Sequence, residues 1–203
     1  YPAPIIIGMV STPVAVGSRL FVCGGEGKGK NFSACLEMKA LDGKIAYEEV
    51  YFSTDLQTNN YNTVAVYQDA VFGFGGNRRA GFLHCTNLAD GRLLWRHPFF
   101  NKHKATTADV IVHNDEVFAS CAYGRGCTKI RISDGRVTQV FDNTVMRNFQ
   151  SCSVLWKGYL YGFDESRLKC IDFKDSSEQW SERGMGRGSL TMCADGRMIA
   201  MSE

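Results

Sequence analysis

The sequence predicts an all-β fold assembled from repeated four-stranded sheets. Three observations carry this prediction: a strand–turn–strand phrase that occurs four times, a β-hairpin phrase before each copy, and the lack of any sustained helical spacing of apolar residues. Glycine is frequent, with 21 residues, and aromatic residues make up 12% of the 203-residue chain. Glycine-rich turns and many aromatic side chains are typical of all-β proteins.

The first phrase is clearest at residues 83–95, LHCTNLADGRLLW, which predicts a strand, a tight turn at Asp90-Gly91 and a second strand ending on Trp95. In each copy the fifth residue after the turn aspartate is expected to wedge between neighbouring sheets. The four aspartates are Asp42, Asp90, Asp134 and Asp175, and the residues five positions later are Tyr47, Trp95, Gln139 and Trp180. Gln139 is not aromatic, and Asp175 precedes Ser176 instead of glycine. These departures are expected to weaken the wedge of the third copy and the turn of the fourth.

The second phrase is a short apolar strand, a polar turn and another apolar strand, which predicts a β-hairpin. Because each hairpin precedes one copy of the first phrase, each repeat has four strands, named A, B, C and D in chain order. The A strands are anchored by Val14, Val64, Val110 and Val154, and a fifth hairpin begins at residue 190. Four-stranded units that repeat every ~40–50 residues are typical of a β-propeller.

We therefore expect a single β-propeller domain over residues 1–203, with blades at about 11–57, 58–103, 104–147 and 148–186 and a partial fifth at 187–203. Four blades and the start of a fifth make a partial ring or half ring, whose exposed sheet faces need a cover. We expect the chain to be a segment of a larger propeller. A pair of chains that completes the ring as a homo-oligomer, or closure as a small ring, are the alternatives.

Charge and hydropathy narrow the classes of partner. The formal net charge of +2 is too small to indicate a nucleic-acid partner or a charged membrane surface. No segment approaches the ~20 continuous apolar residues of a membrane span. The first residues also lack the basic start and long apolar run of a signal peptide. We expect no nucleic-acid partner and no membrane span.

The eight cysteines include no Cys-x-x-Cys pair and no Cys/His cluster with zinc spacing, so no metal site is predicted. We expect buried free thiols that behave as small hydrophobic residues. The alternative is a disulfide between Cys121 and Cys127 across a glycine-rich turn. The four histidines form no Ser/His/Asp arrangement, so no catalytic residue is predicted.

Candidate binding residues lie in the B–C loops and the D–A connections, which share one face of a propeller. Each B–C loop carries a basic residue, which predicts a basic arc for an anionic ligand or an acidic partner. The arc consists of Lys28, Lys30, Arg78, Arg79, Arg125 and Arg167. The D–A connections predict a polar channel mouth for a sugar or peptide, with Asn60, Tyr61, Asn62, Thr106 and Asn148. Ordinary solvated turn residues are the alternative for both sets.

The sequences GYLYGFD at 158–164, LKCID at 168–172 and DGRLLW at 90–95, together with Trp180, resemble the pyrroloquinoline-quinone-like (PQQ-like) β-propeller repeat family. The resemblance covers nearly the whole chain. This family contains quinoprotein dehydrogenases and non-catalytic outer-membrane assembly lipoproteins, usually rings of about seven or eight blades. The resemblance implies a periplasmic or otherwise exported protein, although eight cysteines are unusual in an oxidising compartment.

A shared fold does not choose among these functions. The preferred function is a non-catalytic scaffold that binds a protein or a small polar or anionic ligand. The alternatives are a fragment of a quinoprotein oxidoreductase and a glycan-binding propeller. By resemblance, a quinoprotein would carry adjacent cysteines, a tryptophan stacked on the quinone and an aspartate beside calcium. The sequence has no Cys-Cys pair. We therefore expect no cofactor, and PQQ and calcium belong only to the oxidoreductase alternative.

Overall fold

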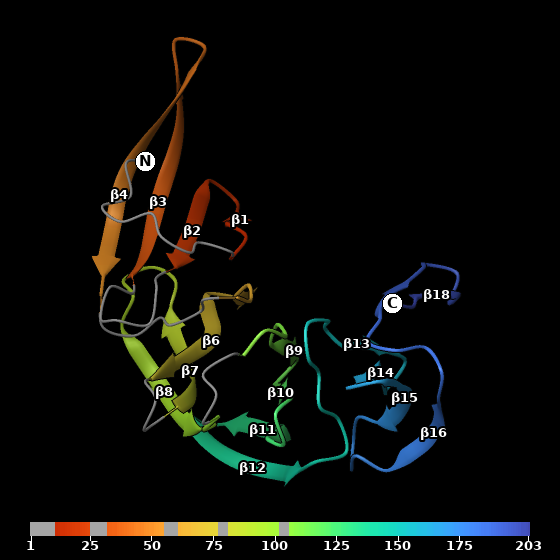
Figure 1. The fold of residues 1–203 in the computed structure, drawn as a ribbon. Coiled ribbons are helices and arrows are strands. Elements are labelled where there is room, and N and C mark those ends of the chain that lie inside the picture. Colours follow the sequence, from red (N-terminus) through yellow and green to blue (C-terminus); the bar gives the residue numbers. More distant parts are fainter. Residues whose placement is uncertain (1–10, 25–31, 55–60, 77–80, 102–105) are drawn as a thin grey trace. The chain divides into compact units, whose positions relative to one another are not determined.

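The computed structural model describes residues 11–24, 32–54, 61–76, 81–101 and 106–203, which form strands and turns without any helix. Four sheets of four strands and one sheet of two strands follow one another along the chain (Figure 1). Within each sheet, consecutive strands pair with each other, which is the arrangement of a propeller blade. The predicted β-propeller fold, with four blades and the start of a fifth, is confirmed. No described segment is a helix long and apolar enough to cross a membrane.

The chain separates into two compact units, Tyr1–Lys104 and Ala105–Glu203, and each is described by itself. The first unit holds two blades. Their strands are β1 Val14–Val16, β2 Arg19–Gly24, β3 Phe32–Leu41 and β4 Lys44–Ser53, then β5 Ala65–Tyr67, β6 Ala70–Gly76, β7 Gly81–Asn87 and β8 Leu93–Pro98. The two blades pack through a buried cluster that includes Phe21, Cys35, Val71 and Leu88.

The second unit holds the third and fourth blades and a two-stranded sheet. Its strands are β9 Ile111–His113, β10 Glu116–Cys121, β11 Gly126–Ser133 and β12 Arg136–Asn143, then β13 Val154–Trp156, β14 Tyr159–Asp164, β15 Arg167–Asp172 and β16 Glu178–Glu182, then β17 Ser189–Met192 and β18 Met198–Met201. A buried cluster with Phe118, Met146, Leu160 and Ile171 joins the third and fourth blades. Val64 and Val110, which were expected to anchor A strands, lie one residue before β5 and β9.

The C–D turn has two forms. In the first blade a two-residue turn lets Leu41 pair with Lys44, and both Asp42 (φ 51°) and Gly43 (φ 73°) are left-handed, as a type I′ hairpin requires. The third blade has the same form at Asp134-Gly135, with φ angles of 51° and 72°.

The second and fourth blades have a wider loop, so the predicted tight turn at Asp90-Gly91 is wrong. There Asp90 Oδ1 accepts a hydrogen bond from the Arg92 backbone N–H at 2.9 Å, and only Gly91 (φ 72°) is left-handed. Ser176, at φ 67°, replaces this glycine in the fourth blade. The fourth blade therefore keeps the same loop with a serine where the second blade has glycine, and the expected weakening of this turn stays a prediction.

An aromatic side chain on each D strand lies opposite the middle of the C strand. The four pairs are Tyr51–Cys35, Trp95–Cys85, Phe141–Lys129 and Trp180–Cys170. A β-bulge follows each of these C-strand residues. The prediction that Tyr47 and Gln139 hold this position is wrong. The tight turns of the first and third blades lengthen the ladder before the bulge, so the aromatic residue comes later, at Tyr51 and Phe141.

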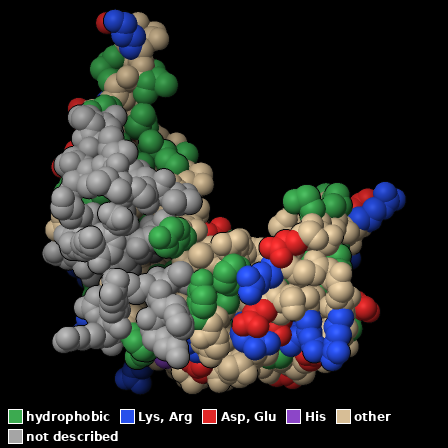
Figure 2. Space-filling model, viewed as in Figure 1, with side chains coloured by type: hydrophobic (Ala, Val, Ile, Leu, Met, Phe, Trp, Pro, Cys, Tyr) green, Lys and Arg blue, Asp and Glu red, His purple; other side chains and the backbone are tan. Residues whose placement is uncertain are grey.

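The C–D hairpin of the first blade is longer than its equivalents. β3 and β4 have 10 residues each and project beyond the rest of their sheet (Figure 1). Hydrophobic side chains lie along this projection (Figure 2), with Leu41 58% and Ile45 80% exposed. Tyr47, which lies on this hairpin, is 41% exposed and does not wedge into a core.

All eight cysteines are free thiols, as the sequence analysis expected. The alternative, a Cys121–Cys127 disulfide, is wrong. Cys121 pairs with Gly126, and Cys127 pairs with Ser120. The two thiols therefore point to opposite faces of the sheet, where no disulfide can join them.

Thiol titration checks this assignment. Six cysteines are buried and two, Cys152 and Cys193, are partly exposed. Burial raises the pKa of Cys23 and Cys85 to about 12 and that of Cys152 to about 11, so these thiols hold little reactive thiolate at pH 8. We expect Ellman's reagent to modify Cys193 first and at most two thiols in the folded protein, against eight in guanidinium. Rapid modification of more than two thiols in native buffer would contradict the burial.

Candidate functional site

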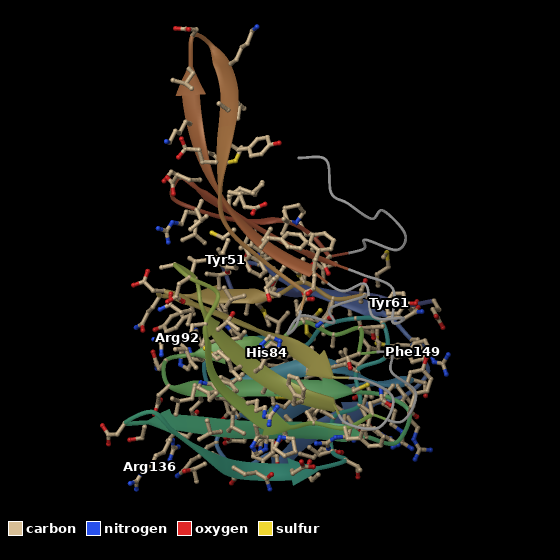
Figure 3. The ribbon with its side chains drawn as sticks, turned by 90° about the vertical axis from the view of Figure 1, so that its left-hand side faces the viewer. Tyr51, Tyr61, His84, Arg92, Arg136 and Phe149 are labelled. Atoms are coloured by element: carbon tan, nitrogen blue, oxygen red, sulfur yellow. The ribbon has the colours of Figure 1, made fainter. Side chains whose placement is uncertain are left out.

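The two ends of the blade strands carry different connections. In the second unit, Phe149 and Arg136 lie at opposite ends, as do Tyr61 and Arg92 in the first unit (Figure 3). We call the end with the B–C loops and D–A connections the loop face, and the end with the A–B and C–D turns the turn face. The loop face of the second unit holds the predicted residues whose geometry is best defined.

Several predicted residues lie outside the described part of the chain: Lys28, Lys30, Asn60, Arg78 and Arg79. Tyr61 is 54% exposed, whereas Asn62 is 3% exposed and its backbone oxygen accepts a hydrogen bond from Ser11 Oγ at 2.7 Å. Thr106 is half-buried. Besides Thr106, the structure describes three further predicted residues in the second unit, Arg125, Asn148 and Arg167, all near the loop face.

Arg125 and Asn148 are engaged in internal contacts. Arg125 forms a bidentate ion pair with Asp142, with Nη1 to Oδ1 at 2.8 Å and Nη2 to Oδ2 at 2.7 Å. Asn148 is 1% exposed. Its Nδ2 donates to the Phe163 carbonyl at 3.2 Å, and its Oδ1 accepts from Ser153 Oγ at 3.0 Å. These contacts fix the loops, so both side chains support the loop face from beneath.

A buried charge network lies below the same loops, and the sequence interpretation missed it. Asp164 accepts hydrogen bonds from Arg147 Nε at 2.7 Å and Nη2 at 3.0 Å, and its Oδ2 lies 2.9 Å from Lys169 Nζ. Lys169 Nζ also contacts Glu178 Oε2 at 3.0 Å and the Val145 carbonyl at 3.1 Å. The Asp164 side chain is 1% exposed and that of Lys169 is 11% exposed. The sequence carries one sign of this network: Lys169 stands between apolar residues of a predicted strand, in LKCID.

The charges in this network stabilise one another. Burial by itself would raise the pKa of Asp164, but hydrogen bonds from Arg147 and Lys169 and their positive charges lower it below its usual range. The hydrogen bond to Asp164 is the main reason that the pKa of Arg147 rises. Asp164 is therefore a structural carboxylate that stays ionised, and it has no proton to supply as a general acid near neutral pH.

Above the network, three side chains form a row on the surface. Tyr123 in the third B–C loop contacts Phe149, with ring centroids 5.4 Å apart. The Arg187 guanidinium lies 4.3 Å from the centroid of the Phe149 ring, a cation–π contact. Tyr123 is 42% exposed and adopts a left-handed φ of 59°, which is unfavourable for a residue without a short polar side chain. We call these three residues the aromatic row.

A small cavity lies beside the row, between the fourth blade and the β17–β18 sheet. Its volume is about 200 Å³, and it is lined by Phe149, Gln150, Ser151, Glu165, Arg187, Gly188, Ser189, Met201, Ser202 and Glu203. Ligand pockets for small molecules usually span ~300–1,000 Å³. This cavity is better suited to one inserted side chain than to a cofactor.

The described residues do not offer the donor set of a calcium-dependent quinone site. No group of three His, Cys, Asp or Glu side chains comes together within these residues to hold a metal ion. The three tryptophans, Trp95, Trp156 and Trp180, all lie within strands of the blades. The sequence also contains no adjacent cysteines. We therefore derive no chemistry through PQQ or calcium.

Four-stranded antiparallel blades with an aromatic residue on each D strand are the architecture of a β-propeller. The family model described as outer membrane protein assembly factor BamB matches residues 7–182, and the chain belongs to this family. No curated protein sequence matches the chain significantly.

Solved structures agree on the fold. BamB from Moraxella catarrhalis has 13% sequence identity and a TM-score of 0.60, with 98% of this chain and 56% of that chain covered. A europium-containing methanol dehydrogenase has 10% identity and a TM-score of 0.64, with 93% and 46% covered. A functionally unknown protein from Desulfotomaculum acetoxidans has 9% identity and a TM-score of 0.67, with 98% and 65% covered. The chain therefore spans about half to two thirds of the length of these structures.

Proposed function

We propose that this chain is a non-catalytic binding scaffold that engages an extended segment of a partner protein through the loop face of its second unit. The observation that supports this function is the aromatic row of Tyr123, Phe149 and Arg187 beside a cavity of about 200 Å³. Tyrosine and arginine are enriched among the residues that dominate protein–protein binding energy. The family description as an outer membrane protein assembly factor agrees with a protein partner.

The support beneath the row favours binding over chemistry. The Arg147–Asp164–Lys169 network and the Arg125–Asp142 pair hold the loops in place before a partner arrives. A preformed surface loses little conformational entropy on binding, which leaves more of the contact energy as affinity. An exported location is part of this proposal by family membership, and it requires the buried thiols to stay reduced in an oxidising compartment.

The proposal is tested with peptides selected on the intact protein from a displayed library of random peptides. Peptides that bind the loop face should lose about 30-fold in affinity with Phe149→Ala, which corresponds to ~2 kcal/mol for an anchor residue. Arg187→Ala should give a similar loss, since it removes the cation above the ring. Isothermal titration calorimetry measures both.

Arg183→Ala is the matched control, because Arg183 is an exposed arginine in the same connection but does not line the cavity. It should leave the affinity within twofold. The proposal is wrong if the library yields no binder, or if Phe149→Ala and Arg187→Ala bind the selected peptides as tightly as the parent protein.

A further inference from the structure

The turn face of the second unit carries a larger groove that the aromatic row does not use. Its volume is about 420 Å³, and its walls come from the A–B turns of the third and fourth blades and the C–D turn of the fourth. This volume falls within the ~300–1,000 Å³ range of small-molecule sites. Its charged lining residues are Glu116, Lys129, Arg131, Lys157, Asp172 and Lys174.

The carboxylates in the groove are already engaged. Glu116 Oε2 lies 3.1 Å from Lys129 Nζ, and its Oε1 accepts a hydrogen bond from Arg131 Nη2 at 2.6 Å. Asp172 Oδ1 accepts a hydrogen bond from the backbone N–H of Lys174 at 2.7 Å. In contrast, neither Lys157 nor Lys174 has an ion pair among the residues that the structure describes. The backbone N–H does not neutralise Asp172, but four cations against two carboxylates still leave the lining of the groove with a net charge of +2 (4 − 2).

The backbone of Lys157 adopts a left-handed conformation. It occupies the first position of the A–B turn of the fourth blade with φ 48°, where the first blade has Gly17 at φ 58°. A left-handed conformation costs a residue such as lysine roughly 1–2 kcal/mol, and its side chain has no short polar group that would bond locally. A glycine would satisfy this turn without strain. Gln68 of the second blade and Asn114 of the third take the same turn position at φ 52° and 54°, so the left-handed conformation is common to the A–B turns, and the case for a ligand rests on the volume and the charges of the groove.

One wall of the groove is aromatic. Phe173 is buried, His113 meets it edge-on with centroids 6.1 Å apart, and Tyr159 is 37% exposed. Lys129, at 1% exposed, donates to the Phe173 carbonyl at 2.7 Å and lies 4.4 Å from the centroid of its ring. These contacts fix the floor of the groove. A flat apolar body can lie along this wall while its charged group meets the lysines at the rim.

We propose that this groove binds a small organic anion, in which a carboxylate or phosphate contacts Lys157 and Lys174 and a flat apolar body lies against Tyr159. The site is separate from the loop face and does not depend on a protein partner there. Carboxylate and phosphate share the chemistry that the lysines recognise, and the experiment below distinguishes them.

The probes are phenyl phosphate, phthalate and benzyl alcohol, titrated calorimetrically into the intact protein at low salt. We expect at least one of the two anions to bind with a Kd below about 1 mM and the uncharged alcohol to bind at least about tenfold more weakly. The tighter of the two anions identifies the preferred charged group. Absence of binding by both anions, or equal binding of benzyl alcohol, overturns the proposal.

Substitutions place the ligand in the groove. Lys157→Gly and Lys174→Ala should each weaken the bound anion about tenfold or more, since each removes one charge-assisted contact. Lys157→Gly should not lower the melting temperature, because glycine accepts φ 48° without strain, so lost binding would not reflect misfolding. Arg136→Ala, an exposed cation on the turn face outside the groove (Figure 3), should leave the affinity within twofold. If Lys157→Gly and Lys174→Ala bind as the parent does, the anion lies elsewhere and the proposal is wrong. Phe149→Ala should leave anion binding unchanged whether or not the loop face binds peptides.

Discussion

Asp164→Ala is expected to lower the free energy of unfolding by about 3–5 kcal/mol, the range found when one partner of a buried ion pair is removed. Asp164 is the shared acceptor of Arg147 and Lys169, and its side chain is 1% exposed. Among the residues that the structure describes, removing it leaves Lys169, 11% exposed, with Glu178 and a backbone carbonyl as its remaining partners. Arg147, at 33% exposed, can be hydrated after the change, so the loss comes mainly from Lys169, which solvent reaches poorly.

Urea unfolding followed by tryptophan fluorescence measures the change. Asp164→Asn keeps the shape but removes the charge, and it should cost nearly as much as Asp164→Ala. Glu48→Gln is the matched control, since it breaks the exposed Lys39–Glu48 pair, whose side chains are 44% and 69% exposed, and should cost less than ~1 kcal/mol. Comparable losses for Asp164→Ala and Glu48→Gln would contradict the assignment of a buried network.

Substitution of Asp164 is also expected to weaken peptide binding at the loop face. Arg147 and Asn148 belong to the connection that presents Phe149, and Arg147 is held by Asp164. Asp164→Asn is therefore expected to weaken loop-face peptides even though residue 164 does not line the cavity. A loss that appears in affinity but not in the heat capacity change of binding would indicate a less ordered surface of unchanged area.

Repeats made the fold predictable, but not the side-chain chemistry between the repeats. The alternation of apolar strands and polar turns determines four strands in each blade wherever it occurs. The position of the D-strand aromatic residue depends on the width of the C–D turn and on a β-bulge. Both are determined by backbone hydrogen bonds, so Tyr51 and Phe141 were missed in favour of Tyr47 and Gln139.

Sites built from several turns are harder still to predict. Lys157, Lys174 and Glu116 are far apart in the sequence and meet only because two blades place their turns side by side. Conversely, Arg125 was correctly placed in a B–C loop, but its partner Asp142 comes from the following strand pair and could not be assigned from loop composition. A single sequence shows which residue types a loop carries, whereas the packing of blades decides which charges remain unpaired.

His84 is expected to make the first unit sensitive to mild acid. Its side chain is fully buried in β7, and burial lowers its pKa to about 4, against a smaller opposing effect of the Phe74 backbone. In the unfolded chain the imidazole takes up a proton below its ordinary pKa of ~6.5, whereas the folded protein keeps it neutral until about pH 4. The unfolded state therefore binds more protons in this window. His84 should cost about 2 kcal/mol of stability between pH 7.5 and pH 5.

The third blade suggests the variant that isolates this effect. Thr128 occupies the position that corresponds to His84, is 0% exposed, and donates from Oγ1 to the Phe141 carbonyl at 3.1 Å. His84→Thr introduces a residue that this position of a blade accepts elsewhere in the chain, although the smaller side chain will lower stability at pH 7.5. The measured quantity is the difference between urea unfolding free energies at pH 7.5 and pH 5. This difference should shrink by about 2 kcal/mol in the variant, since other titrating groups are common to both proteins. An unchanged difference would mean that His84 does not resist protonation in the folded state, and the neutral buried imidazole would have to be abandoned.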